Sequence, residues 1–325
     1  MNKAFKYRLY PNKEQQEMFA KTFGCVRFIY NKMLSDKIEY YKETKRRLDN
    51  TPAQYKEEFE WLKEVDSLAL ANAQMNLQRA YNNFFRDKKV GFPKFKSKKC
   101  NKNNYTTNNQ NGTISTTNNY IKLPKVGNVK IVYHRTIPVA YKIKSATISL
   151  TSSGKYYVSI LTEYETTIPT IKLDKDNSLG LDYSSHSFYV DSQGKEANYP
   201  KFYRNAQEKL AKEQRKLSHM KYSSNNYSKQ KLRVAKISEH ISNQRKDWLH
   251  KLSTELSTMY DYICVEDIDM RSMSQSLKLG KSTMDNGFGM FRTFLEYKLL
   301  TKGKRFIVID KWFPSSKMCR FCGTV

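Results

Sequence analysis

SLGLDYSSHSFYV (residues 178–190) and YICVED (262–267) are two apolar runs that each contain or lead into an acidic residue, Asp182 and Glu266. The β-branched and aromatic content of both runs predicts strands. A carboxylate at the end of a buried strand costs free energy unless a cation offsets its charge. Two strands of one sheet can bring such groups to a common point, where Mg²⁺ would bridge them and an attacking water. The two runs therefore predict a metal-dependent site for phosphodiester chemistry.

The acidic residues near these runs leave this site incomplete. Either acid alone could instead cap a following helix or turn. A two-metal site usually uses a third carboxylate, but Asp267 and Asp269 follow Glu266 too closely to point the same way. Asp310 ends another predicted strand, and a structural cap before the next residues explains it better. The sequence therefore supplies two carboxylates of a site that usually has three.

The segment from about residue 171 onward alternates strand and helix patterns, which is typical of an α/β domain. Its predicted elements are hairpin strands at 178–183 and 187–191, a Lys/Arg-rich helical stretch over about 203–260, a strand at 262–265, a helix around 288–300 and a strand at 305–310.

Upstream of this segment, the sequence predicts a β-rich part and a helical part. Residues 105–165 contain short β-branched and aromatic runs broken by turn residues, as in a small antiparallel barrel or sandwich, and residues 5–10 alternate like a strand. Apolar stripes at helical spacing predict a compact helical module over roughly 12–90. We interpret the stripes as core and expect function on the opposite faces, where these polar residues project: Arg27, Lys32, Arg79 and Asn83.

The charge of this 325-residue chain, formally +27, is spread over its whole length. Basic and acidic residues number 22 and 12 over 1–100, 8 and 2 over 101–170, and 28 and 17 over 171–325. A charge present in every folded segment favours a polyanionic partner, with nucleic acid first. A basic protein kept soluble by its lysines, or one associated with ribosomes, is the alternative.

Two basic segments are candidates for contact with a phosphate backbone. The loop GFPKFKSKKCNKNN (91–104) carries Lys94, Lys96, Lys98 and Lys99, with Phe92 and Phe95 available to stack or anchor. The helical stretch 201–250 has 13 basic and 4 acidic residues, and its candidate contacts are Lys209, Lys212, Arg215, Lys216, Arg245 and Lys246. A solvated loop and a solvated helix face are equally weighted alternatives.

Other classes of protein fit the sequence poorly. No run of about 18 apolar residues is present, and the N-terminus lacks the pattern of a secretion signal. The five cysteines form no disulfide framework, so we expect a cytoplasmic protein with no membrane partner. Cys319 and Cys322 have the spacing of half a zinc ribbon, with a redox Cys pair as the rival interpretation. Only three residues follow, so we expect no stoichiometric tight zinc site in this chain.

Seven ordered motifs spread over essentially the whole chain resemble the TnpB family, transposon-encoded RNA-guided nucleases related to type V CRISPR effectors. The motifs are FKYRLYPNKEQ, FGCVRFIYNKM, VGFPKFKSKK, LGLDYSSHSFYVDSQG, NQRKDWLHKLS, CVEDIDM and WFPSSKMCRFCG.

The resemblance implies an α+β multidomain fold. Residues 1–10 and 105–170 would form a wedge-like β-barrel, with residues 11–104 inserted as a helical recognition lobe. Residues 171–325 would form an RNase H-like (RuvC) α/β domain that lacks its C-terminal end and finishes in half a zinc ribbon. Asp182 and Glu266 match the first two RuvC carboxylates.

The resemblance also implies the partners: a structured guide RNA, and double-stranded DNA read beside a short adjacent motif, bound by a monomeric protein. The family pattern continues to a second Cys pair and a third aspartate, whereas this sequence ends at Val325. We therefore expect weak Mg²⁺ binding and a nuclease-deficient guided binder that acts as a transcriptional repressor. The alternatives are an active Mg²⁺-dependent RNA-guided endonuclease with its C-terminus missing from this sequence, and a general RNA-binding protein.

Overall fold

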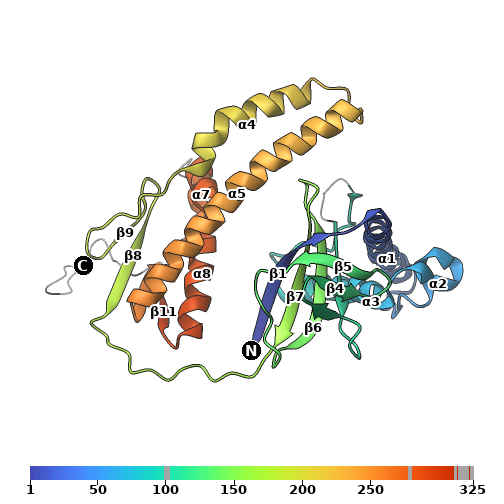
Figure 1. The fold of residues 1–325 in the computed structure, drawn as a ribbon, viewed down its shortest axis with the longest axis horizontal. Helices are drawn as coiled ribbons and strands as arrows, with labels where there is room; N and C mark the ends of the chain where they lie inside the picture. Colours follow the sequence, from blue (N-terminus) through green and yellow to red (C-terminus); the bar gives the residue numbers. More distant parts are fainter. Residues whose placement is uncertain (99–102, 277–279, 311–312, 314–321, 323–325) are drawn as a thin grey trace. The chain divides into compact units, whose positions relative to one another are not determined.

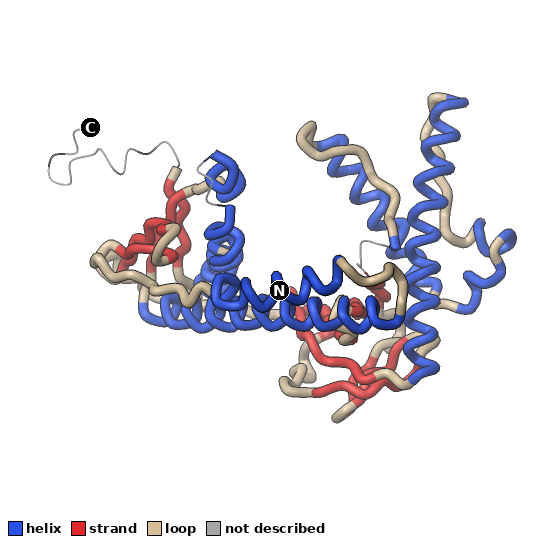
Figure 2. The backbone as a smooth tube through the Cα atoms, turned by 90° about the horizontal axis from the view of Figure 1, so that it is seen from above, coloured by secondary structure: helices blue, strands red, loops and turns tan. Residues whose placement is uncertain are grey.

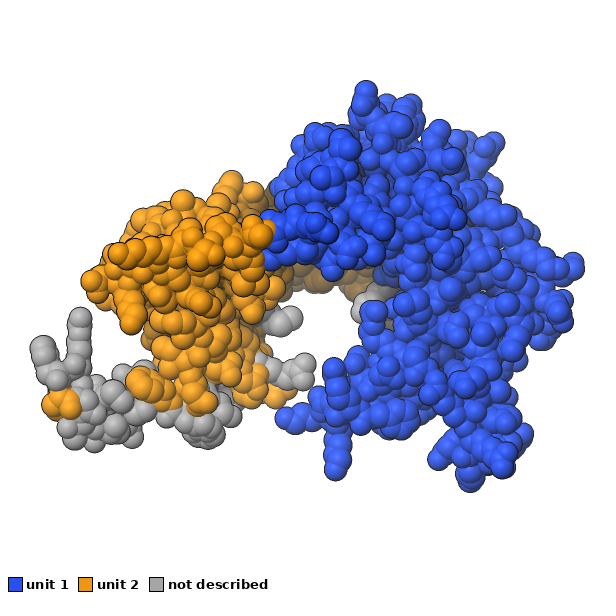
Figure 3. Space-filling view, turned by 90° about the horizontal axis from the view of Figure 1, so that it is seen from below, with its two compact units in different colours: residues 1–166 blue, residues 167–325 orange. Residues whose placement is uncertain are grey.

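The computed structural model describes residues 1–98, 103–276, 280–310, 313 and 322. The chain divides into two compact units, Met1–Thr166 and Thr167–Val325, which Figure 3 colours separately. We describe each unit by itself.

A curled antiparallel sheet of seven strands organises the first unit (Figure 1). Its order is β2-β6-β7-β1-β5-β4-β3, so the N-terminal strand lies between β7 and β5 in the middle of the sheet. Phe5, Tyr7 and Leu9 alternate toward the core along this strand, as a half-buried strand requires. The strands are β1 (Asn2–Tyr10), β2 (Asn103–Asn108), β3 (Ser115–Thr117), β4 (Tyr120–Leu123), β5 (Gly127–Val132), β6 (Lys142–Leu150) and β7 (Tyr156–Glu163).

The helices of the first unit are α1 (Lys13–Thr44), α2 (Tyr55–Glu58), the 3₁₀ helix η1 (Glu60–Glu64) and α3 (Ser67–Arg86). Asn12 starts α1 with a capping box that it shares with Gln15. Phe19 and Phe23 on the buried stripe of α1 contact Tyr105 of β2, and α1 also packs against α3. The predicted apolar stripes are therefore core, except at the end of α3, where Phe85 is 76% exposed.

The second unit contains a four-stranded sheet in the order β11-β10-β8-β9. Its strands are β8 (Ser178–Ser184), β9 (Phe188–Asp191), β10 (Tyr262–Glu266) and β11 (Arg305–Ile309). β8 and β9 form an antiparallel hairpin, whereas β10 pairs in parallel with both β8 and β11. Parallel pairing brings the carboxyl ends of β8 and β10 to the same edge of the sheet.

Five helices belong to this unit within its described residues: α4 (Phe202–Ser218), α5 (Asn225–Met259), α6 (Met270–Ser276), α7 (Gly280–Asn286) and α8 (Phe288–Thr301). α4 and α5 lie side by side as a hairpin (Figure 2). The predicted helical stretch over 203–260 is thus two helices, because the Ser224 side chain caps a new helix by accepting from the Tyr227 N–H. Phe188 lies at the centre of an aromatic core that includes Trp248 and Phe291.

The predicted α+β class is confirmed, as are the hairpin and the later strands of the second unit. Strand β2 is not one of the predicted strand runs, because NNYTTN is polar: its first two residues belong to the predicted loop 91–104, and the other four begin the region predicted to be β-rich. β2 and β3 are the two edges of the seven-stranded sheet, so a closed barrel stays a prediction, as do the proposed domain boundaries. Across the described part of the chain, no helix is long and apolar enough to span a membrane.

Candidate active site

The strand pairing places the two predicted carboxylates next to each other. β8 and β10 are parallel and in register up to the pair Leu181 and Val265, and Asp182 and Glu266 are the next residues of their strands. Neighbouring strands lie about 4.8 Å apart, and equivalent positions project to the same face. Leu181 and Val265 are buried, so the two carboxylates project to the opposite face. The sheet therefore brings Asp182 and Glu266 together, as predicted.

The electrostatics of this pair favour a bound cation. Partial burial raises the pKa of Asp182 first, and the charge of Glu266 raises it further, while a hydrogen bond from the Tyr183 backbone opposes the shift. Two adjacent carboxylates repel each other, and a divalent ion between them would remove that repulsion. Carboxylate oxygens are the ligands that Mg²⁺ prefers, so the residues present fit this ion.

The other acids near the pair have local roles. Asp267 forms an ion pair with Arg292 at 3.4 Å, and Asp269 accepts a hydrogen bond from the Ser272 hydroxyl. The backbone carbonyl of Asp310 accepts from the Phe313 N–H in a turn after β11. Over residues 1–98, 103–276 and 280–310, no group of three or more His, Cys, Asp or Glu side chains is placed to share a metal ion.

Of the predicted zinc half-site, only one residue can be placed. Cys322 is exposed, and Cys319 lies outside the described residues. The expectation that this chain holds no tight zinc site therefore stays a prediction.

The basic residues predicted on α1 and α3 differ in their surroundings. Arg79 is exposed on α3. Arg27 and Lys32 are half-buried and line an open groove of about 460 Å³ on α1. Lys32 forms an ion pair with Asp36 at 3.0 Å, and that hydrogen bond raises its pKa. Among the described residues, Arg27 and Arg79 form no ion pair, so their guanidinium groups can bind an anion. The charge of Lys32 is partly neutralised by Asp36.

The predicted backbone-binding loop is fixed to α1. The Asn31 side chain accepts from the Lys96 N–H at 2.8 Å and donates to its carbonyl at 3.0 Å. The Lys96 ammonium lies 3.8 Å from the centre of the Tyr30 ring, and burial lowers its pKa. Lys94 and Lys98 are exposed, and Lys99 lies outside the described residues. The loop therefore presents Lys94 and Lys98 from an anchored backbone, while the ammonium of Lys96, which is also exposed, lies over the Tyr30 ring.

Both aromatic residues of this loop have a definite place. Phe92 packs edge-on against Tyr81 and Phe84, so it anchors the loop to α3. Phe95 is exposed and lines the groove on α1.

The basic residues predicted on the long helices also divide into exposed and paired groups. Lys209, Lys212 and Arg215 are exposed on α4, whereas Lys216 pairs with Glu213 at 2.9 Å. On α5, Lys246 is exposed. Arg245 on the same helix is half-buried and forms a 3.6 Å ion pair with Asp285, whose side chain is 3% exposed. Nucleic-acid contact by any of these residues stays a prediction.

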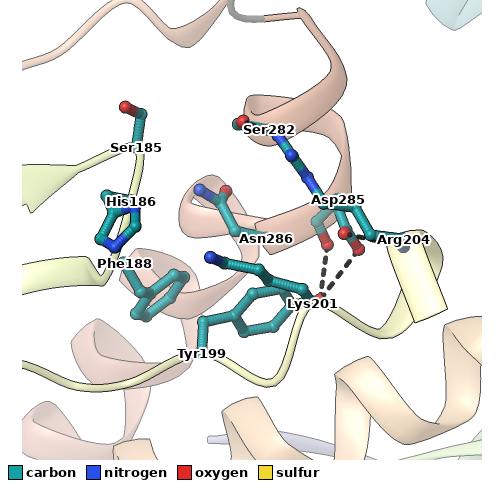
Figure 4. A pocket seen from close by; sticks show the side chains of 9 residues that line it. All are labelled: Ser185, His186, Phe188, Tyr199, Lys201, Arg204, Ser282, Asp285 and Asn286. Carbon is teal, nitrogen blue, oxygen red and sulfur yellow. Dashed lines mark hydrogen bonds between the residues drawn. The ribbon is translucent and has the colours of Figure 1, made fainter.

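The structure also contains a basic pocket that the sequence did not predict (Figure 4). It includes Lys201 and Arg204 at the start of α4 and His186 from the β8–β9 turn. These residues form no contiguous motif, because the fold assembles them from separate elements. The only local signal was the onset of the basic helical stretch at about residue 203.

Comparison with known proteins places these features in a family. Three family models match the chain: "Helix-turn-helix domain" over residues 1–46, "Probable transposase" over 159–277, and "Cas12f1-like, TNB domain" over 288–325. A protein of Streptomyces pristinaespiralis is 34% identical over 333 residues, covering 100% of this chain and 81% of that protein. InsQ of Escherichia coli (strain K12) is 30% identical over 342 residues, covering 98% and 83%. Both are named Putative RNA-guided DNA endonuclease.

A solved structure supports the fold independently. The cryo-EM structure of the Cas12f1–sgRNA–target DNA complex contains a chain that matches this one with a TM-score of 0.59. The match covers 100% of this chain and 92% of that chain at 12% identity, so it shows the fold alone. The fold and the carboxylate pair thus define a protein of the general α+β, TnpB- or RuvC-like class. The chain belongs to the TnpB family.

Proposed function

We propose that this protein binds a guide RNA and uses it to bind complementary double-stranded DNA next to a short motif. One observation carries the proposal: similarity over the whole chain to a relative named for RNA-guided action on DNA. The dispersed charge of +27 supports it, because a protein that holds an RNA and a DNA duplex needs cationic surface on many elements.

We further propose the division of labour within the chain. Residues 1–10 and 105–170 would form the wedge-like barrel, residues 11–104 the recognition lobe, and residues 171–325 the RuvC-like domain. One protein chain would serve each ribonucleoprotein. The pairing of β1 with β5 and β7 supports the first assignment, since it joins the N-terminus to the later strands.

Two consequences of DNA binding are candidates. The first is the nuclease-deficient repressor, which blocks transcription by occupying its target. The second is an RNA-guided endonuclease, and the adjacency of Asp182 and Glu266 is the observation that favours it. Mg²⁺ would supply charge stabilisation and an activated water. The chain's own contribution would be two oxygen donors on paired strands, held at a fixed spacing by the sheet.

The test begins with the RNA that the protein carries when isolated from its host. One specific structured RNA is expected, and random RNA should compete poorly for its place. Equal competition by random RNA would instead identify a general RNA-binding protein.

Incubation of the complex with matched duplex and Mg²⁺ then separates the two consequences. Intact duplex that stays bound supports the repressor. Cleavage that disappears in Asp182→Asn supports the endonuclease, with Asp247→Asn on the exposed surface of α5 as the matched control.

A further inference from the structure

The pocket at the start of α4 has a volume of about 160 Å³ and a cationic wall. Three elements of the second unit build it: the β8–β9 turn, the first residues of α4 and the short helix α7. The Lys201 ammonium points into the pocket toward His186 and Asn286 (Figure 4). Ser185, the first lining residue of the turn, follows Asp182 by three positions, so the pocket lies at the same end of β8 as the carboxylate pair.

The cationic groups of this pocket are available to a ligand. Among the described residues, neither the Lys201 ammonium nor the His186 ring has a hydrogen-bond, ion-pair or ring partner. The Arg204 guanidinium donates to the Ser282 hydroxyl at 2.7 Å, which orients it without neutralising it. A guanidinium held by a neutral hydroxyl keeps donors and full charge for an anion.

The one acid in the pocket wall is already neutralised. Asp285 accepts hydrogen bonds from the Tyr199 hydroxyl and from the Tyr203 N–H, and it lies 3.6 Å from the Arg245 guanidinium. Its side chain is 3% exposed. Asp285 therefore fixes the start of α4 against α7 and leaves the positive charge of Lys201 and Arg204 uncompensated.

The backbone that presents these groups adopts unusual conformations. Lys201 has φ 53° and Phe188 has φ 88°, in the left-handed region that residues other than glycine rarely adopt. Such conformations persist where the surrounding fold imposes them, and they concentrate at binding sites. A glycine at position 201 would adopt this backbone at no steric cost, so the lysine is present despite its conformation.

The volume of the pocket suits a small ligand. At about 30 Å³ for each water in the liquid, the volume corresponds to roughly five water molecules. That space accommodates a tetrahedral phosphate group with part of its hydration. Two cations and two hydroxyls, from Ser185 and Ser282, supply the donors that a phosphate needs.

We propose that this pocket binds one backbone phosphate of the bound nucleic acid and so holds that strand at the carboxylate end of β8. This inference rests on the proposed function, because it names a contact within the guided complex. The pocket would position the strand. A phosphate held there keeps the strand at a fixed place relative to Asp182 and Glu266.

Iodine footprinting of phosphorothioate-substituted strands tests the proposal in the intact complex of protein, RNA and target duplex. Each strand carries the substitution in turn, so RNA and DNA contacts are distinguished. The variants are Lys201→Gly, which removes the ammonium at a position where glycine suits the backbone, and Arg204→Gln. The matched control is Lys125→Gly, the same exchange at an exposed lysine with φ 63° in the turn between β4 and β5.

One or two adjacent phosphates of a single strand should lose their protection several-fold in both pocket variants and stay protected in the control. All other protected positions should be unchanged. An unchanged footprint in both variants, or a uniform loss along every strand, would overturn the proposal. A parent protein that protects no specific strand would instead contradict the proposed function itself.

Discussion

Asp182 stands beside Glu266 on paired parallel strands, and both its partial burial and its neighbour's charge disfavour its ionised form. A residue placed in this way weakens the fold in the absence of a cation, which is a common feature of catalytic and metal-binding positions. The cost is offset once a divalent ion occupies the site.

We predict that Asp182→Asn raises the melting temperature in the absence of divalent ions by roughly 1–3 °C, because the variant loses the repulsion of a partly exposed pair worth at most ~1 kcal/mol. Mg²⁺ should stabilise the parent protein and leave the variant unchanged. Asp247→Asn, at an exposed acid on α5, is the control. An equal response to Mg²⁺ in the parent and in Asp182→Asn would exclude Asp182 as a ligand.

The raised pKa of Asp182 also predicts the direction in which folding stability changes with pH. Because the pKa of Asp182 is raised in the fold, the folded chain binds more protons than the unfolded chain just above the ordinary aspartate range of about 3.9. Its contribution to stability therefore falls as pH rises through that window, and the cost is fully present at neutral pH. The difference in melting temperature between the parent protein and Asp182→Asn, measured as a function of pH, isolates the effect of Asp182.

At the scale of elements, the start of α4 depends on a residue of another helix. Asp285 of α7 accepts from the Tyr203 N–H at 3.0 Å, as a capping residue would, and is paired with Arg245 of α5. Removing one member of a buried pair leaves the other charge uncompensated.

Asp285→Ala is expected to cost about 3 kcal/mol. Tyr199→Phe removes only one neutral donor and should cost about 1 kcal/mol. Hydrogen exchange of peptides covering 199–210 measures both, and the amides of Tyr203 and Arg204 should exchange faster in Asp285→Ala. Exchange at the parent rate in that variant would contradict the proposed cap.

A second element-scale contact joins α8 to α5. The Lys298 ammonium donates to the His250 carbonyl and to the hydroxyls of Ser253 and Thr254, each at 2.7 Å. Lys298→Met would remove this donor from the buried Ser253 hydroxyl, while the Thr254 hydroxyl would still donate to the His250 carbonyl, so the second unit should lose only ~1 kcal/mol of stability. Lys246→Met, on the exposed face of α5, should have little effect. Denaturant unfolding of both variants makes the comparison.

The lowered pKa of Lys298 also predicts a change in the stability of the second unit at alkaline pH. Burial lowers its pKa to about 8, so the folded chain loses this proton before the unfolded chain does. The unfolded state then binds more protons from about pH 8 to the ordinary lysine value of about 10.4, and the Lys298 contribution to stability rises with pH across that window. Lys298→Met should lack the rise.

The limits of sequence-based prediction differ between these elements. The carboxylate pair was predictable, because an acid after an apolar run is a local signal, although only Glu266 ends its strand and Asp182 lies two residues before the end of β8. Strand β2 was not, since only Tyr105 and Thr107 of its residues are buried and its conformation depends on pairing with β6. The pocket at Lys201 was missed for a related reason: its wall comes from three elements that only the tertiary fold brings together.

For the whole molecule, we propose that a bound RNA selects the DNA target. The positive charge occurs throughout the sequence, and basic side chains such as Lys94, Arg79 and Lys212 are exposed on different elements. Such charges bind any nucleic acid backbone and carry no sequence information by themselves. In the function that we propose, base pairing with the RNA supplies most of the sequence specificity, beside the short adjacent motif.

The most direct measurement is therefore to exchange the 3′ extension of the RNA bound to this protein and to measure duplex binding at moderate salt. We predict that binding follows the new extension, with the matched duplex preferred and the former target reduced to non-specific affinity. Binding that stays with the former duplex, or that is equal for matched and scrambled duplexes, would contradict RNA guidance.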